Sequence, residues 1–340
     1  MSLREKDLES VASIILNAQK LWLTTHLKSD GDGVGCELAL LRALQELGKD
    51  ARAINDTVVP KALQFLQESP GEILVYDPAR DDAFIRGADT VVVLDVGLSY
   101  RLGRLDKAFS EASGAKICID HHLEVDSVFA QVLTDHEAGS TGEILFRLLK
   151  TAGIGLNARV STPLFAAISV DTGSFSYERC TPRTFLAASE LVAAGADPYQ
   201  IHMNLNWQRT LQEVKLEGEV IQNLCLDPSG LIAYSEVSRD MLQRYLIDPM
   251  EMPTVVNVPL SVGGVEIALL FVELEPCCIN VSARSKGRVL IDRLARRFGG
   301  GGHPLAAGFT IKATLDQAKA WTLAAARELL AKPSSLCDTA

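Results

Sequence analysis

Short apolar runs alternate with segments of helical periodicity through the first half of the chain. The apolar runs are rich in β-prone residues and lie at residues 21–25, 51–54, 73–76, 90–94 and 115–119. Apolar residues at helical spacing occur at residues 34–47, 140–151 and 162–170. Continuous apolar runs are typical of strands that are buried on both faces of a sheet. The alternation therefore predicts an α/β fold with a doubly wound parallel sheet.

The pattern becomes mostly helical after residue 181 and then returns to strands and helices. Residues 185–194 and a charged stretch from residue 204 to about residue 224 have helical patterns. Strands are predicted at residues 231–237, 265–274 and 279–282, with helices near residues 288–298 and 314–331. A chain of 340 residues is longer than one typical domain. We predict a first domain at residues 1–190, a helical connector at residues 191–228 and a smaller α/β domain at residues 229–340.

Acidic and imidazole side chains stand where the predicted strands end. They are His26, Asp30 and Asp32 after the first run, Asp95 directly after residues 90–94, and Asp120, His121 and His122 after residues 115–119. Ligands of open α/β sheets bind beyond the carboxyl ends of the strands. Carboxylates and imidazoles are common ligands of divalent metals. With Asp171, the carboxylates of Asp30, Asp32 and Asp95 carry four negative charges, which two divalent cations would balance.

Each of these residues also has an ordinary structural explanation when it is taken alone. Asp and Gly residues at positions 30–33 are typical of a solvated turn. Asp95 and Asp120 stand where helix N-caps occur, and a lone histidine such as His26 is usually structural. The loops after neighbouring parallel strands must lie side by side, however. If these residues had only structural roles, a separate explanation would have to hold for each of them, and their gathering at one edge of the sheet would be a coincidence. This convergence favours a metal site.

Charge and apolar content narrow the classes of function. The formal net charge of −10 argues against a protein that coats long nucleic acid, which requires a broad basic surface. A small phosphorylated substrate needs only a local basic patch. No apolar run approaches the ~20 residues that cross a bilayer, and the N-terminus is charged, so we expect a cytoplasmic protein without a membrane segment. Seven cysteines without a Cys-x-x-Cys pair are interpreted as reduced thiols.

The motifs, taken in order, resemble those of the DHH phosphoesterase superfamily. The resemblance is carried by His26-x-x-x-Asp30-Gly31-Asp32, Asp95, Asp120-His121-His122 and Asp171-Thr172-Gly173. Residues 281–285 and the glycine-rich residues 299–308 resemble the DHH-associated C-terminal domain. The resemblance spans nearly the whole chain. Within the superfamily, the chain is similar to the NrnA-type branch of bifunctional oligoribonucleases and pAp phosphatases.

The resemblance implies two metal ions that share one carboxylate. It assigns His26, Asp30 and Asp95 to the first ion, and Asp32, Asp95, His121 and Asp171 to the second. A set of carboxylates and imidazoles suits manganese or magnesium, and the resemblance favours manganese. Two such ions stabilise the attacking and leaving oxygens of an in-line phosphoryl displacement.

The resemblance also implies roles for residues that do not bind metal. His122 is expected to face the substrate, where it positions the scissile phosphate or protonates the leaving oxygen. Asp120 is expected to orient neighbouring groups rather than to bind metal. In the second domain, Arg284, Gly300, Gly301, Gly302 and His303 are expected to bind the substrate. The fork of an arginine suits a pair of phosphate oxygens, and bare glycine backbone allows a nucleotide to approach closely.

Two departures from the family pattern bear on substrate selection. Ser29 stands where this branch commonly has proline, and residues 123–126 lack the asparagine that usually follows the second histidine. Glu124 and Asp126 are expected to add acidic character beside the site.

We therefore expect a metal-dependent hydrolase that acts on short oligoribonucleotides and on 3′-phosphoadenosine 5′-phosphate (pAp), and not on long duplexes. Two alternatives stay open at this point. The first is a phosphodiesterase of cyclic dinucleotides or of linear dinucleotides such as pApA, which would use the same metals. The second is a nucleotide sensor without catalysis, although every expected metal ligand is present. A homodimer is compatible with the sequence, which does not set the oligomeric state.

Overall fold

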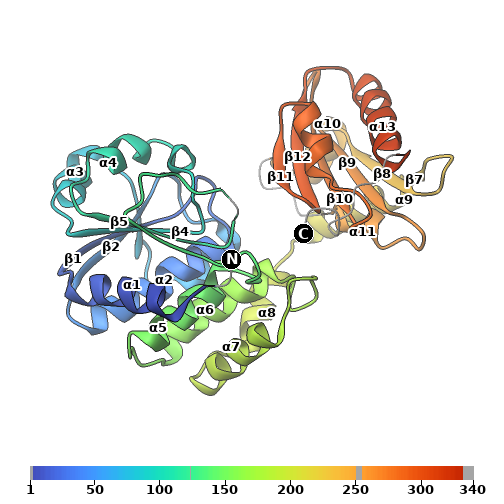
Figure 1. The fold of residues 1–340 in the computed structure, drawn as a ribbon. Helices are drawn as coiled ribbons and strands as arrows, with labels where there is room; N and C mark the ends of the chain where they lie inside the picture. Colours follow the sequence, from blue (N-terminus) through green and yellow to red (C-terminus); the bar gives the residue numbers. More distant parts are fainter. Residues whose placement is uncertain (1–2, 123, 250–254, 332–340) are drawn as a thin grey trace. The chain divides into compact units, whose positions relative to one another are not determined.

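Two compact units make up the chain in the computed structural model (Figure 1). The structure describes residues 3–122, 124–249 and 255–331. The first unit is Met1–Gln208 and the second is Arg209–Ala340. Residues 191–208 of the predicted connector belong to the first unit, and residues 209–228 belong to the second.

The first unit is built on a six-stranded sheet in which every neighbouring pair is parallel. Its strands are β1 (Lys20–Thr24), β2 (Asp50–Asn55), β3 (Ile73–Val75), β4 (Thr90–Leu94), β5 (Ala115–Asp120) and β6 (Gln131–Thr134). The strand order is β3-β2-β1-β4-β5-β6, so the order reverses between β1 and β4. This is the doubly wound topology that the sequence predicts, and its switch point lies between two strands that end in predicted ligands.

Helices cover both faces of this sheet. They are α1 (Glu5–Asn17), α2 (Gly31–Glu46), α3 (Pro78–Arg86), α4 (Leu105–Glu111), α5 (Thr141–Thr151), α6 (Ala158–Asp171), α7 (Pro182–Ala193) and α8 (Pro198–Asn206), with 3₁₀ turns η1 (Lys61–Leu66) and η2 (Ser99–Leu102). In Figure 1, α3 and α4 lie on one face, and α1, α2, α5 and α6 lie on the other. Leu21 and Leu23 of β1 belong to one apolar core and Trp22 to another, because successive strand side chains point to opposite faces.

Two helices begin or end differently from the prediction. Helix α2 begins at Gly31 instead of near Val34, because the Asp30 side chain accepts the backbone N–H groups of Asp32 (3.0 Å) and Gly33 (3.3 Å). Asp32 therefore lies in the first turn of a helix and not in a loop. The single helix expected from residue 204 to about residue 224 is also wrong, because α8 ends at Asn206 and α9 starts at Leu211.

The second unit contains a smaller mixed sheet in the order β11-β12-β10-β9-β8-β7. Its elements are α9 (Leu211–Gln222), β7 (Cys225–Leu226), β8 (Ile232–Val237), α10 (Arg239–Tyr245), α11 (Asn257–Leu260), β9 (Ile267–Glu275), β10 (Cys278–Ser285), α12 (Asp292–Arg297), β11 (Gly301–His303), β12 (Ala306–Ile311) and α13 (Leu315–Ala331). Only β8 and β9 pair in parallel among these described strands. Its two faces carry separate apolar cores, one with α12 and α13 and one with α9 and α10.

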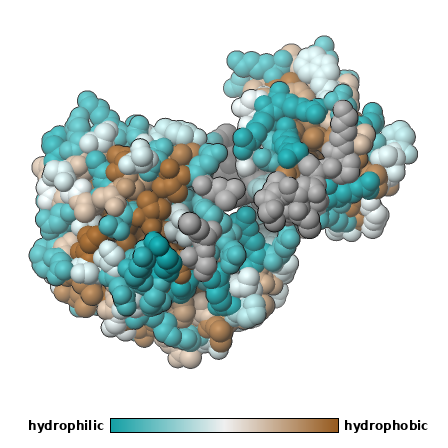
Figure 2. Space-filling view, in the orientation of Figure 1, coloured by the Kyte–Doolittle hydropathy of each residue, from teal (hydrophilic) through white to brown (hydrophobic). Residues whose placement is uncertain are grey.

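Hydrophilic residues predominate on the surface that Figure 2 shows, and hydrophobic residues gather in a patch on the first unit. A surface of this mixed kind is ordinary for a globular protein. Within the described ranges, none of the helices combines the length and the apolarity that a membrane crossing takes.

A close contact between α2 and α6 holds the first unit together and depends on Gly35. A Cβ atom at Gly35 would lie 2.4 Å from the carbonyl oxygen of Pro163 and 2.9 Å from Cβ of Ala167. We expect Gly35→Ala to lower the free energy of unfolding by about 1–3 kcal/mol, because the two helices must move apart. Chemical denaturation of the variant and the wild type measures this difference.

Gly155→Ala is the matched control, because among the described residues no atom lies within 4 Å of the Cβ position at Gly155. Its effect should stay within about 0.5 kcal/mol. Equal stability of the Gly35→Ala protein and the wild type would show that α2 and α6 do not need this contact.

Candidate metal centre

The candidate site forms at the carboxyl ends of β1, β4 and β5. His26 follows β1, Asp95 follows β4 directly, and His121 follows β5. Asp95 has a φ of 61°, a left-handed conformation that is rare for residues other than glycine. Its N–H donates to the carbonyl oxygen of Ile119 at 2.9 Å, which ties the end of β4 to the end of β5. Backbone conformations of this kind gather at functional sites.

Two groups of ligand-type atoms meet at Asp95. In the first group, Nε2 of His26 lies 3.5 Å from Oδ2 of Asp95 and 3.8 Å from Oδ2 of Asp30. The second group joins Asp32, His121 and Asp171, and Nε2 of His121 lies 3.1 Å from Oδ2 of Asp171. The same Nε2 lies 3.7 Å from Oδ1 of Asp95. Asp95 thus presents one oxygen to each group.

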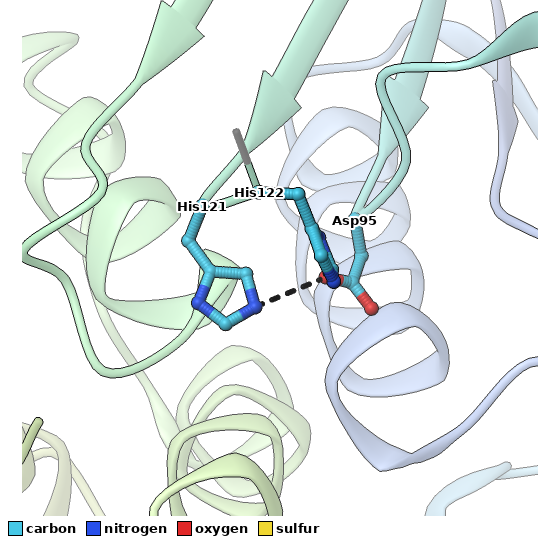
Figure 3. Close-up of side chains that lie close together, drawn as sticks. All are labelled: Asp95, His121 and His122. Carbon is cyan, nitrogen blue, oxygen red and sulfur yellow. Dashed lines mark ion pairs between the residues drawn. The ribbon is translucent and has the colours of Figure 1, made fainter. Parts of the chain in front are cut away.

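His122 also approaches Asp95. Figure 3 shows His121 and His122 beside Asp95, with the two rings in an edge-to-face arrangement and centroids 4.6 Å apart. Nδ1 of His122 lies 2.6 Å from Oδ1 of Asp120 and 3.7 Å from Oδ1 of Asp95. Asp120 is fully buried, and it also accepts the backbone N–H of His122 at 3.0 Å. Asp120 therefore fixes the ring of His122, and the ring in turn touches the carboxylate that the two groups share.

The N-terminus of α5 holds two of the carboxylates in place. The backbone N–H groups of Thr141 and Gly142 donate to the two oxygens of Asp32 at 2.6 and 2.9 Å. The Thr141 hydroxyl donates to Oδ1 of Asp95 at 3.0 Å. A helix N-terminus attracts negative charge. Thr141 and Gly142 are not among the site residues that the sequence predicts, although the pattern Ser140-x-x-Glu143 at the start of a predicted helix is a signal for such a helix end.

The tautomers of His26 and His121 are set by backbone carbonyl groups. Nδ1 of His26 lies 3.0 Å from the carbonyl oxygen of Leu27, and Nδ1 of His121 lies 3.5 Å from that of Ala138. A proton on each Nδ1 directs Nε2 of both rings toward the carboxylates. This arrangement is typical of metal-binding histidines, whose second nitrogen donates to a carbonyl or carboxylate group.

The protonation of the site shows how strongly it attracts positive charge. Burial disfavours a charged ring, but hydrogen bonds with Asp30 and Asp95 outweigh it and raise the pKa of His26 to about 10. The pKa of His121 is also raised to about 10, because its contact with Asp171 and the charges of Asp95 and Asp32 outweigh burial. Burial and neighbouring carboxylates raise the pKa of Asp95 and of Asp32. The donor set fits hard divalent cations, which would take the place of protons on the two rings.

The comparisons with known proteins agree with this geometry. Residues 20–174 match the DHH family, N-terminal domain, and residues 232–332 match the DHHA1 domain. The chain is 30% identical to the bifunctional oligoribonuclease and PAP phosphatase NrnA of Thermus thermophilus, over 93% of this chain and 92% of that protein. The chain belongs to the DHH family. It is also 30% identical to NrnA of Bacillus subtilis, over 85% of this chain and 88% of that protein.

A solved structure matches the DHH chain over nearly its full length. It is an exopolyphosphatase-related protein from Bacteroides fragilis, with a TM-score of 0.89 and 25% sequence identity. The match covers 96% of this chain and 97% of that chain. The fold and the two-domain family that the sequence indicated are therefore confirmed.

The DHHA1 domain places two of the predicted substrate residues, Arg284 and His303, in one row of its sheet. Arg284 on β10 pairs with Ala306 on β12, and His303 on β11 pairs with the same Ala306. The backbones of Arg284 and His303 therefore lie about 10 Å apart, two strand spacings. The glycine tract is partly a strand and not only a loop, since Gly301 and Gly302 pair with β12. A Cβ atom at Gly300 would lie 2.2 Å from the carbonyl oxygen of Gly308.

One of the acidic residues in the departing segment, Asp126, has a structural role. The Asp126 side chain accepts the N–H of Ser99 at 2.7 Å, and its own N–H donates to the carbonyl oxygen of Gly97 at 2.8 Å. Asp126 thus joins the segment after β5 to the segment after β4. Ser29 is buried within the loop between the predicted ligands His26 and Asp30.

Metal binding is expected to release protons from this centre. At a pH of about 7, the raised pKa values keep the rings of His26 and His121 in the cationic form, with a proton on both nitrogens. An unperturbed histidine, with a pKa of about 6.5, would mostly have lost the second proton. We expect manganese binding at this pH to release at least two protons, one from each ring and any that burial keeps on Asp32 or Asp95, and we expect manganese affinity to rise as the pH increases toward the raised pKa values. Calorimetric titrations in buffers with different ionisation enthalpies count the protons.

His202 on α8 provides the control for this titration. His202→Gln removes a histidine that contacts Trp207 and does not lie in the metal groups, so the proton count should not change. Binding of manganese without proton release would contradict the protonation of His26 and His121.

Proposed function

We propose that the DHH chain is a two-metal phosphoesterase that hydrolyses short oligoribonucleotides and pAp. The observation that carries the proposal is the position of Asp95, whose two oxygens face His26 and His121 from opposite groups of ligands. The NrnA relatives support the choice of substrate, because they are named for both activities and the chain covers about nine-tenths of their length.

We assign His26, Asp30 and Asp95 to one ion, and Asp32, Asp95, His121 and Asp171 to the other. The carboxylate-rich set favours manganese, with magnesium as the alternative. When bound, two divalent ions supply the positive charge that activates a water nucleophile and stabilises the phosphoryl oxygens. The chain's part is to fix the ligands. The α5 N-terminus holds Asp32 and Asp95, and the carbonyl groups of Leu27 and Ala138 hold the two rings.

His122 is assigned to the substrate side of the centre. Asp120 accepts a hydrogen bond from Nδ1 of His122, which leaves Nε2 as the ring nitrogen that exchanges a proton. Burial opposes ionisation of Asp120, but the hydrogen bond with His122 outweighs it and lowers the pKa of this carboxyl group. Asp120 thus holds the His122 ring in a fixed orientation, from which Nε2 would donate a proton to the leaving oxygen or a hydrogen bond to the scissile phosphate.

The DHHA1 domain is assigned to substrate binding through Arg284, Gly300, Gly301, Gly302 and His303. The shared position of Arg284 and His303 opposite Ala306 supports a local phosphate-binding surface in a chain of net charge −10. A local surface of this kind suits a short or mononucleotide substrate better than a long one. A cytoplasmic location and a homodimer stay predictions.

The test is a comparison of substrates at equal manganese concentration. The panel contains pAp, diribonucleotides to pentaribonucleotides, a long single-stranded RNA, pApA and cyclic di-AMP. The proposal expects the highest kcat/KM for short RNA and pAp. Preference for pApA or cyclic di-AMP would favour the dinucleotide phosphodiesterase. Nucleotide binding without turnover of any substrate would leave only the sensor.

A further inference from the structure

The segment after α6 leaves the metal centre through an unusual turn. Asp171, the last residue of α6, faces His121 in the second ligand group. Gly173, Ser174 and Phe175 then follow with φ values of 55°, 55° and 65°. A left-handed conformation is uncommon for residues other than glycine, and here two such residues adopt it in succession. Conformations of this kind persist only where their surroundings hold them.

Aromatic packing and hydrogen bonds hold the turn. The Phe175 ring packs with Phe165 and Phe185, at centroid distances of 5.4 and 5.8 Å. The Thr172 hydroxyl accepts the N–H of Phe175 at 3.2 Å, and the Thr172 carbonyl accepts the N–H of Tyr177 at 3.0 Å. Phe175 therefore anchors the turn on the first unit, and Thr172 fixes the backbone of the residues that follow.

The turn presents the ring of Tyr177 at the surface. A Cβ atom at Gly173 would lie 2.4 Å from Cε1 and Cζ of Tyr177, so the ring lies directly against the bare backbone of Gly173. Tyr177 is nevertheless 55% exposed. Within the part of the chain that the structure describes, no hydrogen bond is made by its hydroxyl group. The ring thus lies against a residue two positions after Asp171, and it is not part of the apolar core of the first unit.

We propose that Tyr177 is the surface on which a substrate nucleobase stacks while the phosphate lies at the metal centre. The proposal rests on the proposed function and adds a residue that selects nucleotides over other phosphate esters. Stacking on an aromatic ring is tolerant of sequence, because every base has a π-face. Base contacts of this kind suit an enzyme that degrades short RNAs of mixed sequence, and a ring that already packs against the backbone loses less conformational freedom on binding than a free side chain.

The test compares a substrate that has a base with one that lacks it. The two substrates are pAp and ribose 3,5-bisphosphate, whose phosphates are alike. Tyr177→Ala should lower kcat/KM for pAp by about 5- to 150-fold, which is the effect of losing one stacked base. The same substitution should leave kcat/KM for ribose 3,5-bisphosphate unchanged. Tyr177→Phe should keep the wild-type value for both substrates, because stacking requires the ring and not the hydroxyl.

The matched control is Tyr199→Ala on α8. Tyr199 is 60% exposed, but it packs against Trp207 instead of the turn after Asp171. Its replacement should therefore leave kcat/KM unchanged for both substrates. The proposal is overturned if Tyr177→Ala leaves kcat/KM for pAp unchanged. It is also overturned if the substitution lowers kcat/KM equally for both substrates, because an equal loss would indicate a structural role. Failure of the proposed function gives a separate result, because the wild type would then hydrolyse neither pAp nor short RNA.

Discussion

Asp95→Asn is expected to lower kcat/KM for pAp and for short RNA by at least about 100-fold, since loss of even an outer partner of a metal ligand costs about 10- to 100-fold. Asp95 approaches His26, His121 and His122 within 3.5–3.7 Å and accepts the Thr141 hydroxyl. An asparagine replaces one of its oxygens with an N–H donor, so one of the two ligand groups loses its shared anion. Steady-state hydrolysis measures the loss.

Asp50→Asn is the matched control for this substitution. Asp50 is the first residue of β2 in the same parallel sheet, and it lies at the amino end of its strand, away from the edge that carries the ligands. Its replacement should leave kcat/KM within about twofold of the wild type, as is usual for surface positions. Full activity of Asp95→Asn would exclude the carboxylate as a shared ligand.

Removal of divalent metal is expected to abolish hydrolysis and to lower the melting temperature of the first unit. Burial and the charges of neighbouring carboxylates raise the pKa of Asp32 and of Asp95, which means that their ionised forms are unfavourable without a cation. An ion that binds only the folded protein stabilises it by about 2.7 kcal/mol at a concentration of roughly 100 times its Kd. Dialysis against a chelator, followed by addition of manganese, measures both effects in one sample.

The Asp95→Asn protein is the control for metal removal. Manganese should raise its melting temperature less than that of the wild type, because one ligand group has lost an anion. An equal rise in the two proteins would place the bound ions elsewhere. Hydrolysis that persists in the chelated wild type would contradict a metal-dependent reaction.

Local patterns predicted the part of the site that depends on strand ends. The apolar run at β4 and its end at Asp95 are visible in the sequence, because a buried parallel strand is continuous and apolar. The switch point between β1 and β4 then follows from the doubly wound topology. The strand ends and the topology together therefore predict that His26, Asp95 and His121 lie close to one another.

Contacts between distant segments could not be predicted in this way. The hydrogen bond between Asp32 and the N–H of Thr141 joins residues 109 positions apart, which the packing of α5 against α2 brings together. Strand β11 was missed for a similar reason. Glycine has a low intrinsic preference for strands, so the pairing of Gly301 and Gly302 depends on β12 and not on their own sequence.

The turn after Asp171 shows a second limit of sequence patterns. Asp171-Thr172-Gly173 indicates a ligand and a glycine, but the left-handed backbone of Ser174 and Phe175 depends on the packing of Phe175 with Phe165 and Phe185. The exposure of Tyr177 is a consequence of that packing. A hydropathy pattern cannot distinguish this ring from an aromatic residue of the core.

Anomalous diffraction from a crystal of the protein with manganese would locate the bound ions. A shared carboxylate at Asp95 predicts two manganese peaks in the first unit, one beside His26, Asp30 and Asp95 and one beside Asp32, His121 and Asp171, with Asp95 in contact with both. A single peak, or peaks away from Asp95, would contradict a two-metal centre built on a shared carboxylate.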